Sequence, residues 1–203
     1  EELVTALTLR QVDFANAVVW LDPGTQRTAE AQRVLGELTK RRGDEIALVT
    51  TVATGQHSVD KHVDVDGCVT DHGGRGVETA AHLFAALGSM AAPVLWSCLD
   101  AEDIRSSLGQ PKQPSLLVHA RWSPDLPDLL FACEDDRSAV ESSRHVAAFV
   151  FMTEQSRVPT RLVIESIRRR TPAAESFVYQ VSVGYLASKR DAPDVVGLTL
   201  LLR

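Results

Sequence analysis

Four residues in the first half of the chain have the types and positions that a phosphate group needs. Gly24 and Thr25 follow a predicted strand, and Arg75 and Thr79 stand near the start of a predicted helix. A phosphate binds backbone N–H groups at a tight turn, a hydroxyl group and a nearby cation. The sequence therefore predicts a phosphate-binding site in which Gly24 donates a backbone N–H, Thr25 and Thr79 supply hydroxyl groups, and Arg75 pairs with the charge.

The elements that position these residues form a repeating strand and helix pattern. Short apolar runs predict buried strands, and apolar residues three and four apart predict helices. The predicted strands are 17–21, 46–51, 65–70 and 93–97, and the predicted helices are 28–41, 76–87 and 100–108. This order predicts an α/β fold with a mainly parallel four-stranded sheet flanked by helices. The loops after parallel strands lie at one edge, where ligands commonly bind.

The second half of the chain is predicted to be a strand-rich extension. Residues 109–114, rich in glycine and proline, predict a joint. Beyond it we expect strands at 116–120, 147–152, 177–186 and 195–202, a helix at 160–170, and a loop or exposed helix at 134–144. The last two strands are predicted to pair as a hairpin. The predicted organisation is a lead-in at 1–16, the α/β domain at 17–110, and an extension at 111–203 packed on it.

The pattern from Val65 to Ile104 resembles a BRCT domain, the phosphopeptide-binding module of DNA-damage and chromosome proteins. The string Gly67-Cys68-Val69-Thr70 is similar to the end of the family's third strand, and Thr79 matches a threonine of its second helix. Ala81 stands where the family has its phosphate-binding lysine. With its extra strands, the chain is also similar to the BRCT region of a kinetoplastid kinetochore protein that binds microtubules.

The resemblance implies a module that is not an enzyme and that recognises a phosphorylated protein segment in a nuclear chromosome or kinetochore assembly. It implies a phosphorylated protein or peptide as partner, with kinetochore subunits or microtubules as further partners. A scaffold that has lost phosphate binding, together with the family lysine, is an alternative within the same family.

Two alternatives come from other classes of protein. Asp22, Asp71 and Ser97 follow or end predicted strands, where a receiver-like signalling domain holds its metal-binding and phosphoacceptor carboxylates and a hydroxyl. His72 and Cys98 stand where a caspase-like cysteine hydrolase has its base and nucleophile. Aspartates at strand ends are also common turn formers, and a cysteine is often only a packed core residue.

Composition limits the other classes. Hydrophobic residues make up 44% of the chain, which supports a folded core. The formal net charge is −6, with −7 on residues 1–110 and +1 on residues 111–203, so nucleic acid is a disfavoured partner. No apolar stretch is long enough to cross a bilayer, and no metal or cofactor is expected. Three widely spaced cysteines and no visible signal peptide predict a reducing, intracellular location.

Overall fold

The chain of 203 residues is seen in a computed structural model, in which it forms two compact units. The first unit is residues 1–91 with 108–116, and the second is residues 92–107 with 117–203. The predicted division into domains near residue 110 is a separate matter and stays a prediction. The residues that the structure describes are 7–8, 17–22, 33, 36–37, 40, 48–53, 67–73, 76–89, 94–99, 101–110, 113–126, 128–183 and 194–203.

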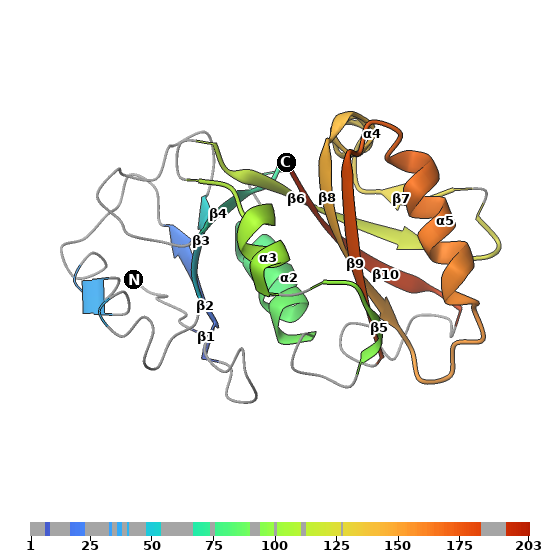
Figure 1. Cartoon of the computed structure of the whole chain (residues 1–203), viewed down its shortest axis with the longest axis horizontal. Helices are drawn as coiled ribbons and strands as arrows, with labels where there is room; N and C mark the ends of the chain where they lie inside the picture. The colour runs from blue at the N-terminus through green and yellow to red at the C-terminus, as the bar shows by residue number, and fades with distance from the viewer. Residues whose placement is uncertain are drawn as a thin grey trace. The chain divides into compact units, whose positions relative to one another are not determined.

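The first unit is built on a largely parallel sheet. Its strands are β1 (Leu7–Thr8), β2 (Ala17–Asp22), β3 (Leu48–Ala53), β4 (Gly67–Thr70) and the start of β6 (Ser115–Trp122). The neighbouring pairs β2–β3, β3–β4 and β4–β6 are parallel, and β1 is antiparallel to β2 at the edge. Parallel strands need crossover connections, and α2 (Gly76–Ser89) follows β4 and packs on β2 and β3 (Figure 1).

The core of the first unit explains why these segments fold as they do. Val52, Cys68, Val69 and Leu83 are fully buried. Cys68 and Val69 are neighbours on β4 and point to opposite faces, so both faces of this strand are covered. The predicted joint at 109–114 is a tight turn, because the backbones of Gln110 and Gln113 hydrogen-bond to each other. The Cys68 N–H also donates to the Gly109 carbonyl at 2.7 Å, which ties this turn to β4.

The second unit has a mixed sheet. It contains β5 (Val94–Ser97), β7 (Leu130–Phe131), β8 (His145–Met152), β9 (Ser176–Val183) and β10 (Val196–Leu202), together with the end of β6. The order is β6-β10-β8-β9-β5, and β7 pairs with β6. The pair β8–β9 is parallel, whereas β10–β8, β5–β9 and β6–β7 are antiparallel.

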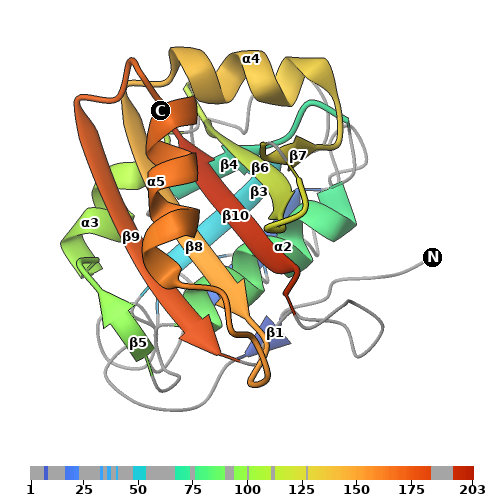
Figure 2. The same ribbon diagram turned by 90° about the vertical axis from the view of Figure 1, so that its right-hand side faces the viewer.

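Helices cover both faces of this mixed sheet. Helix α5 (Thr160–Arg170) lies along one face of β8, β9 and β10, and α3 (Ala101–Ser107) lies on the opposite face against β8 (Figures 1 and 2). Helix α4 (Glu134–Ser142) crosses the end of the strands (Figure 2). Phe149, Phe151, Ile167 and Leu200 are fully buried and form much of the core between these layers.

The general α/β class is confirmed, with sheets of mixed direction flanked by helices, but two predicted pairings are wrong. The segment 93–97 was expected to be the fourth parallel strand of the first sheet, and it pairs antiparallel with β9 in the second unit instead. The fourth parallel position belongs to the start of β6. The predicted hairpin of 177–186 with 195–202 is also wrong, since β8 lies between β9 and β10. Among the described helices, none is long and apolar enough to span a membrane.

Candidate functional site

Three parallel strands of the first unit end at the same level. Asp22 of β2 lies opposite Ala53 of β3, and Val52 lies opposite Val69 of β4, so Thr70 is also level with Ala53. The loops that follow β2 and β4 therefore leave the sheet at one edge. They start two strand spacings apart, about 10 Å. In α/β proteins this carboxyl edge is where ligands bind.

The turn after β4 is held together by one carboxylate. Asp71 Oδ1 accepts a hydrogen bond from the Gly73 N–H at 3.2 Å, and Asp71 Oδ2 accepts one from the Thr79 hydroxyl. Thr79 is buried in α2, while His72 and Gly73 are exposed at the edge. Asp71 thus ties the end of β4 to the first turns of α2 and fixes where the exposed residues stand.

The start of α2 gives this edge its electrostatic character. The helix is 14 residues long, and its N-terminus carries partial positive charge from unpaired backbone N–H groups. The Asp71 carboxylate and Glu78 in the first turn offset part of that charge. Of the described residues at this edge, His72 and Gly73 are exposed, and the Gly73 N–H is already donated to Asp71.

The structure places only part of the predicted phosphate site. Thr79 lies at the first turns of α2 with its hydroxyl donated to Asp71. Gly24, Thr25 and Arg75 lie outside the described residues, so the role of all four stays a prediction. The bridging role of Asp71 was missed by the sequence reasoning. Its signal was present in the sequence, because an aspartate two residues before a glycine at a strand end commonly forms a turn of this kind.

The residues of the two alternative sites are divided between the units. Asp71 and His72 belong to the first unit, and Ser97 and Cys98 belong to the second. The Ser97 hydroxyl donates to the Leu99 carbonyl at 2.9 Å, which is a local turn contact. Cys98 is an exposed free thiol rather than a packed one. Within the described ranges, no group of three or more histidine, cysteine or acidic side chains is placed to hold a metal.

Comparison with solved structures identifies the fold. CetZ from Methanosaeta thermophila strain DSM 6194 matches over 92% of this chain and 60% of its own, with a TM-score of 0.53 and 11% identity. The chain has a tubulin/FtsZ-like fold. Weaker matches are the GDP-bound monomer of CetZ1 from Haloferax volcanii (TM-score 0.47, 12% identity, 92% and 63% covered) and the empty FtsZ dimer of M. jannaschii (0.41, 10%, 92% and 53%).

The chain spans about 60% of the length of the M. thermophila CetZ. No family model matches the sequence, and no curated protein matches it. The likeness, at 11% identity, is one of fold.

This fold overturns the resemblance to BRCT domains and the inferences that rested on it. The BRCT identification is wrong because the solved structures that match have the tubulin/FtsZ-like fold. The inference of a phosphopeptide-recognition module in a kinetochore assembly is therefore also wrong. The same holds for the inferred partners, which were phosphorylated proteins, kinetochore subunits and microtubules. The receiver-like and caspase-like alternatives gain no support. The same likeness of fold contradicts the expectation that the chain is not an enzyme.

Proposed function

We propose that this chain is a nucleotide-binding part of a tubulin/FtsZ-like GTPase that self-associates. The nucleotide's phosphates bind at the carboxyl edge of the first unit's parallel sheet, and GTP is hydrolysed to GDP and phosphate. The observation that carries the proposal is the level ending of β2, β3 and β4, in a chain whose fold is similar to that of CetZ.

The geometry supports a ligand that is larger than a single ion. The loops after β2 and β4 leave the sheet about 10 Å apart, a span that a nucleotide can bridge and an isolated phosphate cannot. The loop after β2 contains Gly24 and Thr25, which supply a backbone N–H and a hydroxyl in this proposal. The turn after β4 presents His72 and Gly73 at the same edge. Thr79 acts indirectly, because its hydroxyl holds Asp71.

The test is a titration of the full chain with fluorescent GDP and GTP analogues, with an ATP analogue alongside. Thr25→Ala removes one hydrogen bond to a charged group, worth about 1.5–3 kcal/mol, so we expect the Kd to rise about tenfold to a hundredfold. Thr160→Ala is the matched control, since Thr160 lies on α5 in the second unit and should leave the Kd unchanged.

Hydrolysis and assembly are measured on the same samples. Phosphate release from GTP and sedimentation with GTP against GDP report the two activities. Binding of neither guanine nucleotide contradicts the proposal, and so does equal loss of affinity in Thr25→Ala and Thr160→Ala. Binding without hydrolysis or sedimentation would limit the function to nucleotide binding.

A further inference from the structure

A groove runs beside α5 in the second unit. Its volume is about 520 Å³, and its lining includes Pro159, Arg161, Ile164, Glu165 and Arg168 from the α5 segment and Tyr179 from β9. The groove therefore combines cationic and apolar walls.

The two arginines of the groove differ in how they are paired. Arg161 donates to Glu165 at 2.6 Å, one helical turn away, and this contact and the charge of Glu165 raise the pKa of Arg161. The Arg168 guanidinium lies 5.3 Å from the centre of the Phe177 ring. Among the described residues, Arg168 has no carboxylate partner. Arg168 is thus a positioned cation, held over an aromatic ring, that can take an anionic partner.

The remaining walls are apolar and are rigidly placed. Ile164 is 8% exposed, and Tyr179 lies on β9 between the strands β8 and β5. The Cys98 N–H donates to the Tyr179 carbonyl at 3.0 Å, and the Tyr179 N–H donates to the Cys98 Sγ at 3.2 Å. These two contacts hold the backbone of Tyr179 on the β5 side, and the pairing of β9 with β8 holds it on the other, so the groove exists before any partner binds. A preformed groove lowers the entropic cost of binding.

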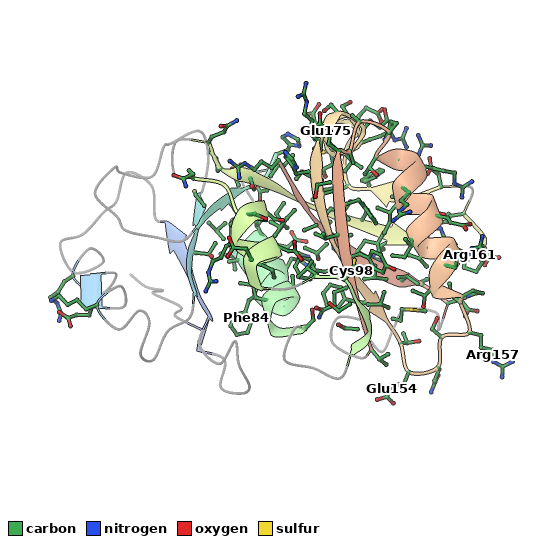
Figure 3. The ribbon with its side chains drawn as sticks, viewed as in Figure 1. Phe84, Cys98, Glu154, Arg157, Arg161 and Glu175 are labelled. Carbon is green, nitrogen blue, oxygen red and sulfur yellow. The ribbon has the colours of Figure 1, made fainter. Side chains whose placement is uncertain are left out.

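Charged side chains of both signs stand around the groove. Figure 3 shows Arg157 and Arg161 on the same side of the second unit near the start of α5, with Glu154 beside Arg157. Arg169 is exposed on the same helix but does not line the groove, and it donates to the Ser166 hydroxyl at 3.1 Å. Arg161 is paired with Glu165, so Arg168 is the groove cation that remains to attract an acidic partner.

We propose that the groove between α5 and β9 binds an acidic segment of a partner protein, with a carboxylate on Arg168 and a neighbouring apolar side chain against Ile164 and Tyr179. A planar guanidinium stacked on a ring is suited to bind a carboxylate through two hydrogen bonds. The apolar walls select a peptide over a nucleic acid, which needs a row of cations for its phosphates. This proposal stands independently of nucleotide binding, because every residue in it belongs to the second unit.

The test uses the full chain and fluorescein-labelled twelve-residue peptides that carry glutamate next to leucine or phenylalanine. Copies with lysine in place of glutamate, and copies with alanine in place of the apolar residue, are measured alongside. We expect binding that needs both residues of the pair and that weakens as salt rises. Arg168→Ala should weaken it about tenfold, as expected for loss of a charge-assisted pair, and Arg168→Lys should weaken it less.

Arg169→Ala is the matched control, because it removes the same charge one residue away and Arg169 does not line the groove. Unchanged binding in Arg169→Ala supports the proposal, and an equal loss in both variants overturns it in favour of general charge attraction. Absence of binding to every peptide also overturns it. A further outcome is self-association in sedimentation that is lost in Arg168→Ala and kept in Arg169→Ala. That result would mean that a second copy of the chain occupies the groove, and it would overturn the proposal of a partner peptide. The fluorescent-nucleotide titration on the same variants keeps the two proposals separate, since Arg168→Ala should leave it unchanged.

Discussion

Two threonines of the first unit should respond in opposite directions to the same substitution. The Thr79 hydroxyl donates to the Asp71 carboxylate, whereas Thr50 on β3 is fully buried and its hydroxyl has no partner among the described residues. Valine keeps the shape of threonine and replaces the hydroxyl with a methyl group. We expect Thr79→Val to destabilise the unit and Thr50→Val to stabilise it.

The magnitudes follow from these environments. A hydrogen bond to a charged group contributes about 1.5–3 kcal/mol, and Asp71 is only partly buried, so the lower half of that range applies to Thr79→Val. A buried polar group without a partner costs about 1–3 kcal/mol, so Thr50→Val should raise the free energy of unfolding by about 1–2 kcal/mol. The two variants should therefore differ by about 3 kcal/mol.

Urea denaturation followed by circular dichroism measures this difference, and hydrogen exchange of amides in β3, β4 and α2 localises it to the first unit. The double-mutant cycle of Thr79→Val with Asp71→Ala isolates the hydrogen bond, and it should give a coupling of about 1–2 kcal/mol. Two substitutions with the same sign and size, or a coupling near zero, would refute the assignment of Asp71 as the residue that ties β4 to α2.

Two further predictions concern the thiols and the second unit. Of the three cysteines, Cys98 and Cys133 are exposed and Cys68 is buried. A thiol reagent should therefore modify two groups rapidly in the native protein and the third only on unfolding. Three rapid reactions would contradict this burial pattern. The Trp122 indole N–H donates to the Ser166 hydroxyl at 3.0 Å in a buried position. Ser166→Ala should therefore lower the free energy of unfolding by about 1–2 kcal/mol. An unchanged thermal midpoint would show that the indole finds another partner.

Local patterns in the sequence predicted the elements well. The helix predicted at 160–170 is α5 within the same bounds, and the strands predicted at 65–70 and 195–202 differ from β4 and β10 by one or two residues at their starts. These segments are defined by features that lie inside them. In α5 the buried residues Val163, Ile164 and Ile167 recur at helical spacing, and three arginines end the helix.

Strand pairing was harder to predict, because it depends on residues far apart in the chain. The segment 93–97 follows a helix that itself follows β4, and such an order favours a parallel neighbour of β4. The actual partner of β4 is the start of β6, which enters after α3, and nothing in either apolar run distinguishes the two outcomes. The phosphate-site residues Gly24, Thr25 and Arg75 depend on this sheet edge in the same way.

The wrong hairpin prediction shows that the continuous apolar character of β8 is a stronger indication of strand order than the closeness of two strands in the sequence. In β8 seven of eight residues are buried, with no alternation of exposed and buried positions, and a strand of this kind belongs at the centre of a sheet. The predicted order of strand 147–152, helix 160–170 and strand 177–186 is also a β-α-β unit, which requires β8 and β9 to be parallel. A central β8 then needs a second neighbour, and β10 is the remaining apolar strand of the second unit that can supply it. The arrangement β10-β8-β9, with α5 as the crossover beside the groove, follows from those two observations, whereas a BRCT domain with an appended hairpin leaves one edge of its most buried strand unpaired.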